Sequence, residues 1–118
     1  MDNIMNETFE KLEVWKRSHA LSIQLYRILE HCRDWGFKDQ ITRAGNSISD
    51  NIAEGRERPG KAEYRVFIGY AKGSAGEVRS QVLRAKALNY MAADEADRLV
   101  LELSEISRML HGLYNSMK

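Results

Sequence analysis

Apolar residues recur along most of this chain at steps of three and four, the spacing of one face of an α-helix. The pattern is most regular in the second half, where it forms two seams with a seven-residue period. Seams of this kind are typical of long helices that cross their neighbours at about 20°. They predict helices over about 61–88 and 94–117. The residues of the first seam are Tyr64, Ile68, Ala71, Ala75, Val78, Val82 and Ala85, and those of the second are Ala96, Leu99, Leu103, Ile106, Leu110, Leu113 and Met117.

The first half of the chain predicts two more helices. Over about 8–33 there are two apolar stripes, so we expect this helix to be covered on more than one side. Trp35-Gly36-Phe37 interrupts the pattern, and Asp39 is a candidate N-cap for a helix over 39–55 that ends at Gly55, ahead of Pro59. One stripe of the first helix is Leu12, Trp15, His19, Ile23 and Tyr26, which predicts a buried His19, and the other is Val14, Leu21, Leu25 and Ile28.

Four helices joined by short connections predict the fold class. Consecutive helices with short loops run antiparallel, and the chain shows no alternation of apolar and polar residues typical of strands. The 118 residues are the size of one domain. We therefore expect an all-α protein, an antiparallel up-down-up-down four-helix bundle that forms a single domain over residues 1–118.

The segment QITRAGNSISDNIAEG, residues 40–55, is unusual because small and polar residues interrupt its helical pattern. Ile41, Ala44, Gly45, Ile48 and Ile52 share one face. Glycine inside a helix costs about 0.5–1 kcal/mol relative to alanine, and close approach of two backbones is the usual reason to keep it. The helix over 61–88 also has glycines, at positions 69, 73 and 76. We expect the two small-residue helices to meet closely, within one bundle or between subunits.

Composition narrows the class of protein. The chain is 43% hydrophobic and 30% charged, with a net charge of +1 and a single cysteine, Cys32. No apolar run approaches the roughly 18 residues that span a bilayer, and the acidic start MDNIMNETFE does not resemble a signal peptide. These features predict a cytoplasmic protein without membrane contact.

Motifs for catalysis or cofactor binding are incomplete. GRERPGKA, residues 55–62, approaches a phosphate-binding loop, but Ala62 stands where a hydroxyl would hold magnesium and a helix precedes the motif. The Glu-x-x-His pairs of di-iron bundles are missing at all three histidines, and no nucleophile–base pair can be argued. We therefore expect no enzyme activity, no metal site and no cofactor.

Positive charge is concentrated in one part of the chain. Residues 56–86 contain eight basic and three acidic side chains. Four of the basic residues follow at steps of seven and form a basic stripe along the third helix: Arg65, Lys72, Arg79 and Lys86. Arg56, Arg58 and Lys61 extend it into the preceding loop. Such a stripe is either a solvated face or a row of phosphate contacts, and the second reading predicts salt-sensitive binding of RNA or DNA.

The same segment, QITRAGNSISDNIAEG, resembles the signature of the four-helix-bundle proteins encoded by intervening sequences in bacterial 23S ribosomal RNA genes, roughly Q-I-x-R-A-x-x-S-I-x-x-N-I-A-E-G. The likeness extends over about residues 9–115. It includes Tyr64, Phe67, Ala71, Gly73, Ser74 and Glu77, which are similar to E-[FY]-x-x-F-x-x-x-A-x-G-S-x-x-E. The first interhelical segment departs from the family, since CRDWGFKDQ is shorter and lacks the usual proline and glutamate.

The resemblance implies a homopentamer with no known catalytic activity, and kinship to accessory proteins of diversity-generating retroelements, which bind nucleic acid and a reverse transcriptase. Two functions follow as hypotheses: an oligomeric nucleic-acid-binding protein, with RNA favoured, or an adaptor that docks a reverse transcriptase or another protein. The polar signature residues are expected to form a subunit interface or to have a structural role; they are Gln40, Arg43, Ser47, Asn51 and Glu54.

Overall fold

A computed structural model describes residues 8–118 of the chain. A short 3₁₀ helix, η2 (Phe9–Lys11), precedes four α-helices, and the described residues contain no strand. The helices are α1 (Glu13–Ile28), α2 (Trp35–Glu57), α3 (Lys61–Ala87) and α4 (Ala93–Ser116).

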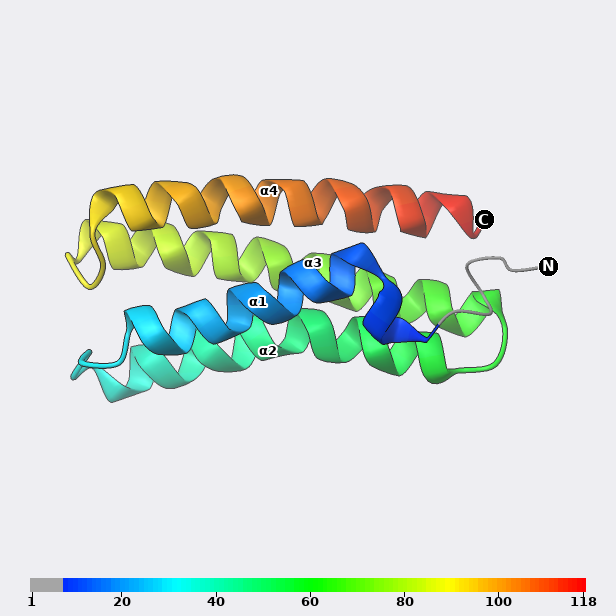
Figure 1. The fold of residues 1–118 in the computed structure, drawn as a ribbon, viewed down its shortest axis with the longest axis horizontal. Coiled ribbons are helices and arrows are strands. Elements are labelled where there is room, and N and C mark those ends of the chain that lie inside the picture. The colour runs from blue at the N-terminus through cyan, green and yellow to red at the C-terminus, as the bar shows by residue number, and fades with distance from the viewer. Residues whose placement is uncertain (1–7) are drawn as a thin grey trace.

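The helices form the antiparallel bundle that their spacing predicts. Each packs on the next along the chain, and α1 also touches α4, so α1 and α3 lie diagonally opposite (Figure 1). The described part of the molecule is elongated, with extents of 48 × 22 × 20 Å. α1 has 16 residues and α3 has 27, which correspond to about 24 Å and 40 Å of helix. α1 therefore runs beside only part of the bundle.

The core is built from the predicted seams. All seven seam residues of α3 and six of the seven on α4 are buried, and Leu113 is partly buried against them. On α2 the face with Ile41, Ile48 and Ile52 is fully buried. Their burial supplies most of the apolar area removed from water, and it confirms these faces.

The two apolar stripes of α1 differ in burial. Val14, Leu21 and Leu25 face the core, and Ser18 is buried among them with its hydroxyl donating to the Val14 carbonyl at 2.7 Å. In the other stripe only Leu12 is buried. The prediction of a buried His19 is wrong: the residue is exposed, and its ring stacks on Trp15 at 4.8 Å between centroids.

Two helix boundaries differ from the prediction. α1 spans 13–28 rather than 8–33, because the chain turns at Leu12 and again after Ile28. α2 begins at Trp35 rather than Asp39: the Asp34 carboxylate accepts a hydrogen bond from the Phe37 amide at 3.1 Å and acts as the N-cap. Trp35-Gly36-Phe37 is thus the first turn of a helix, and α2 continues past Gly55 to Glu57.

Glycines of α2 allow two close approaches, to different helices. A Cβ at Gly45 would lie 2.7 Å from Leu25 Cδ1 of α1. A Cβ at Gly55 would lie 2.8 Å from Phe67 Cβ and 3.2 Å from the Tyr64 carbonyl oxygen of α3. The close-approach prediction holds for α2, but the glycines of α3 are not its partners: nothing lies within 4 Å of a Cβ placed at Gly73 or Gly76.

Candidate nucleic-acid interface

The basic stripe of α3 lies along its boundary with α4, where the two helices form a shallow groove of about 440 Å³. From α3 the groove takes Lys72 and Arg79. α4 contributes a second set at helical spacing: Ser104, Ser107, Arg108 and His111. No carboxylate lines this groove, and its hydroxyls and cations are the groups that commonly bind phosphate oxygens in nucleic-acid complexes.

The residues at the two ends of the basic stripe bind groups of α4. Arg65 lies over the Tyr114 ring, with Cζ 3.7 Å from the centroid, and its Nε donates to the Tyr114 carbonyl at 3.1 Å. At the other end Lys86 pairs with Asp97 at 2.7 Å. Between them, Arg79 donates to Ser104 Oγ at 3.4 Å. The four residues therefore do lie along one edge, but the middle of the stripe, Lys72 and Arg79, is better placed for a ligand than its ends.

The three basic residues expected in the loop before α3 are placed differently from one another. Lys61 is exposed at the first position of α3. Arg58 lies over the Phe67 ring at 5.0 Å and approaches Glu54 at 3.4 Å. Arg56 is only 8% exposed, within 5.6 Å of the Tyr64 ring, so its side chain belongs to the interior of the bundle rather than to a basic surface.

The residues that α4 adds to the groove were not predicted. Ser104, Ser107, Arg108 and His111 form pairs that are three or four residues apart, which places them on one side of a helix. That spacing was the available signal, but only the pairing of α3 with α4 shows that they face Lys72 and Arg79. Arg108 is also bound to Glu105 at 2.6 Å, which lowers the pKa of the Glu105 carboxyl, as does Arg17 of α1.

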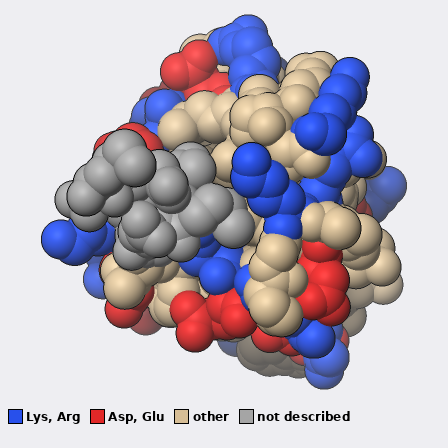
Figure 2. Space-filling view, turned by 90° about the vertical axis from the view of Figure 1, so that its right-hand side faces the viewer, with Lys and Arg blue, Asp and Glu red and all other residues tan. Residues whose placement is uncertain are grey.

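The distribution of charge over the surface is uneven. In the end-on view of Figure 2, Lys and Arg side chains gather at the upper right, and much of the acidic surface lies lower down. α3 contains six basic and two acidic residues, a net of +4 in a chain whose net charge is +1. A polyanion therefore meets the most favourable potential along α3.

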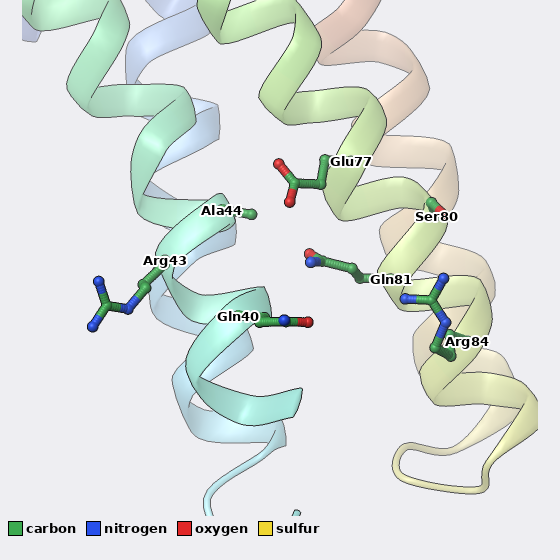
Figure 3. A pocket seen from close by; sticks show the side chains of 7 residues that line it. All are labelled: Gln40, Arg43, Ala44, Glu77, Ser80, Gln81 and Arg84. Atoms are coloured by element: carbon green, nitrogen blue, oxygen red, sulfur yellow. The ribbon is translucent and has the colours of Figure 1, made fainter. Parts of the chain in front are cut away.

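A second groove, of about 630 Å³, lies between α2 and α3 (Figure 3). It brings together two of the residues that carry the family resemblance, Gln40 and Arg43, with side chains of α3. In Figure 3 the Arg43 side chain points away from α3, whereas Glu77 and Gln81 point toward α2. The lining residues are Gln40, Arg43, Ala44, Glu77, Ser80, Gln81 and Arg84.

The polar signature residues of α2 have partners within the bundle. Arg43 binds Asp39 at 2.8 Å, one helical turn away, and Glu54 faces Arg58 in the same way. Ser47 and Ser74 join α2 to α3 through their hydroxyls at 2.9 Å, and Asn51 donates to the Ser47 carbonyl and hydroxyl, both at 2.8 Å. Ser47 and Asn51 therefore have a structural role at the α2–α3 contact, while Arg43 and Glu54 lie on the exposed side.

Among residues 8–118 no group of three or more His, Cys, Asp or Glu side chains is arranged to hold a metal ion. In the same part of the chain, no helix combines the length and the apolar character needed to cross a membrane.

The sequence model of the family described as 23S rRNA-intervening sequence protein matches residues 10–112. The chain belongs to this family. A solved structure supports the fold: a protein with unknown function from the S23 ribosomal protein family, from Bacteroides thetaiotaomicron VPI-5482, superposes with a TM-score of 0.81. The two chains are 18% identical, and the alignment covers 86% of this chain and 97% of the other. No curated protein matches the chain.

Proposed function

We propose that the protein is a non-enzymatic, homo-oligomeric RNA-binding protein of the cytoplasm that contacts phosphates through the α3–α4 groove. The observation that carries this proposal is the acid-free lining of that groove, where Lys72 and Arg79 of α3 lie near Arg108 and His111 of α4. Cations on two helices can follow a phosphate backbone, and the two serines can donate to its oxygens. Several copies in one assembly multiply a weak contact.

The proposal is tested by removing the central cations. We expect Lys72→Gln/Arg79→Gln/Arg108→Gln to bind a structured RNA more than tenfold more weakly at low salt. Because each phosphate contact releases counterions, the slope of log affinity against log salt should fall by about 2–3. The measurement is a fluorescence-anisotropy titration at several salt concentrations.

The matched control removes three exposed cations elsewhere, Lys11→Gln/Arg33→Gln/Arg98→Gln, and so has the same net charge. It should bind within about threefold of the wild type, because screening limits the effect of distant charges. An equal loss in both triple variants would show that overall charge, not the groove, governs binding.

A second function is favoured by exposed apolar residues that do not line the groove. Leu101 of α4 and Trp35 of α2 are 70% and 68% exposed. A few apolar or aromatic side chains commonly carry most of the binding energy of a protein interface, and either residue could serve as such an anchor. They would suit an adaptor that binds a protein partner, such as a reverse transcriptase. A flanking reverse transcriptase gene together with loss of co-purification in Leu101→Asp would favour the adaptor over the RNA-binding protein.

A further inference from the structure

The outer face of α3, which points away from the other helices, has three large exposed apolar side chains and two glycines, beside the polar Glu77, Ser80 and Arg84. Because glycine has no side chain, the helix surface is low at those two positions. Val66, Tyr70 and Leu83 are 49%, 57% and 50% exposed. Between them lie Gly73 and Gly76, and no atom of the described chain lies within 4 Å of a Cβ built at either. We name these five residues the α3 trough. Glycine is costly inside a helix, and no packing within the described chain accounts for it at these two positions.

A row of aromatic and apolar side chains lies along the outside of α1. Trp15 and His19 stack with an interplanar angle of 9°, and they are followed along the helix by Ile23 and Tyr26, which are 37% and 45% exposed. The Tyr26 hydroxyl accepts a hydrogen bond from Asn46 Nδ2 at 2.8 Å, which holds the ring against α2. We name Trp15, His19, Ile23 and Tyr26 the α1 ridge.

The ridge and the trough face different directions, because α1 and α3 are diagonally opposite in the bundle (Figure 1). One molecule can therefore use its ridge on one neighbour and its trough on another. Such a head-to-tail contact is heterologous, and it closes into a ring when the rotation between copies permits. We propose that the α1 ridge of one copy packs into the α3 trough of the next; this rests on the homo-oligomer of the proposed function.

The α1 ridge and the α3 trough lie at about the same position along the long axis of the bundle. Gly45 of α2 lies against Leu25 of α1, and Ser47, two residues further along α2, bonds Ser74 of α3. The middle of α3 and the second half of α1 are thus at about the same level. In a closed ring whose axis follows the bundle, neighbours are not displaced along that axis, and α1 runs parallel to α3. Ile23 then comes opposite Gly73, and Tyr26 opposite Gly76.

Charges flanking the two surfaces are complementary in the same register. Lys16 and Arg27 flank the α1 ridge, and Glu63 and Glu77 flank the α3 trough. Of these four, only Lys16 has an ion pair in the described chain, a 3.8 Å contact with Glu13. At matched heights Arg27 comes opposite Glu77, and Lys16 near Glu63. A second copy would therefore place the apolar side chains of its α1 ridge over Gly73 and Gly76, and would bring basic residues close to the acidic residues that flank the α3 trough.

The test is a disulfide between two different variants, both made in a Cys32→Ser background. Ile23→Cys mixed with Gly73→Cys should give a cross-linked dimer as the main product under mild oxidation, while neither variant alone should. Ile23→Cys mixed with Leu101→Cys is the control, because Leu101 is exposed on α4 and outside both surfaces. Equal cross-linking in the control mixture, or none in the test mixture, would overturn the proposed contact.

A second variant separates assembly from folding. Gly76→Gln has open space for its side chain within one chain, so it should remain helical, but it should sediment as a smaller species than the wild type. Gly112→Gln, at an equally open glycine of α4, should keep the wild-type size. If Arg43→Ala rather than Gly76→Gln reduces the size, the subunit boundary lies on α2 and the inference fails while the oligomer stands. A wild type that sediments as a monomer would overturn both.

Discussion

Glycines within helices play different parts in this bundle. Gly55 permits a contact with α3 that any side chain would obstruct, whereas Gly112 of α4 faces open space. The sequence predicts Gly55 as the end of a helix, whereas α2 continues through it to Glu57, and the sequence does not show which neighbour, if any, comes close to either glycine. Only the geometry of helix packing separates a glycine that is needed from one that is merely tolerated.

Gly55→Ala should therefore destabilise the fold. Its Cβ would meet the Phe67 Cβ at 2.8 Å and the Tyr64 carbonyl at 3.2 Å, and neither atom can swing away. Overpacking of this kind costs about 1–3 kcal/mol of unfolding free energy. Urea denaturation followed by circular dichroism measures it. Gly112→Ala is the control, which should stabilise the protein by about 0.5–1 kcal/mol, and equal effects in both variants would contradict the packing argument.

Asp34 gives stability a dependence on pH. Hydrogen bonds from the Tyr90 hydroxyl, at 2.7 Å, and from the Phe37 amide hold the pKa of its carboxyl below the usual value. Because the folded pKa is lowered, the ionised group stabilises the fold above the ordinary aspartate pKa of about 3.8, and this is lost as pH falls through the lower folded value.

Asp34→Ala should accordingly lower the melting temperature at neutral pH, and the difference from wild type should shrink as the pH drops below about 3.8. Thermal melts between pH 7 and pH 2 measure this. Asp50→Ala, an exposed position on α2, should differ little from wild type throughout. A gap for Asp34→Ala that stays constant down to pH 2 would argue against the N-cap role of the carboxylate.

At the scale of elements, α1 is the least firmly held helix. It is the shortest of the four, and its link to α4 rests on Arg17, whose guanidinium binds Glu102 through Nη2 at 2.6 Å and through Nε at 2.9 Å. Arg17 also reaches Glu105 at 3.5 Å. Since both partners are about one-third exposed, the pair contributes modestly, about 1 kcal/mol at most.

Arg17→Ala should loosen α1 without loosening α3. We expect amide hydrogen exchange in α1 to speed up by about fivefold, because partial opening of one element follows the loss of its own contacts. Exchange measured by mass spectrometry resolves the helices. Arg98→Ala, which removes an exposed cation of α4, is the control and should leave α1 unchanged. Faster exchange in all four helices would instead indicate a general loss of stability.

In α1 the sequence does not predict which apolar stripe is buried. Both of its apolar stripes have helical spacing, and the sequence does not show that Val14, Leu21 and Leu25 are buried while His19 and Ile23 are not. Elsewhere the period was decisive: the seams of α3 and α4 were predicted residue by residue. The sequence pattern does not predict the start of α2, because Gly36 is unfavourable inside a helix, although Asp34 is as good an N-cap as Asp39.

At the scale of the whole molecule, the fold followed from the sequence better than the site did. Lys72 and Arg79 were expected on one edge of α3, and they lie there. Arg108 and His111 could not be paired with them, because the buried seam of α4 shows which face points to the core but not which of its two sides lies toward α3. Arg56 looked like a loop cation and is instead interior, since α2 continues through it and turns it toward Tyr64.

The concentration of cations on α3 makes the bundle electrically polar across its short dimension. α3 has a net charge of +4, whereas the other described residues, 8–60 and 88–118, sum to −1. A body whose positive charge is concentrated on one side experiences a torque in the field of a nearby polyanion. A polyanion that approached this bundle would therefore turn α3 toward itself, and electrostatic steering would act on the orientation of the encounter as well as on its frequency.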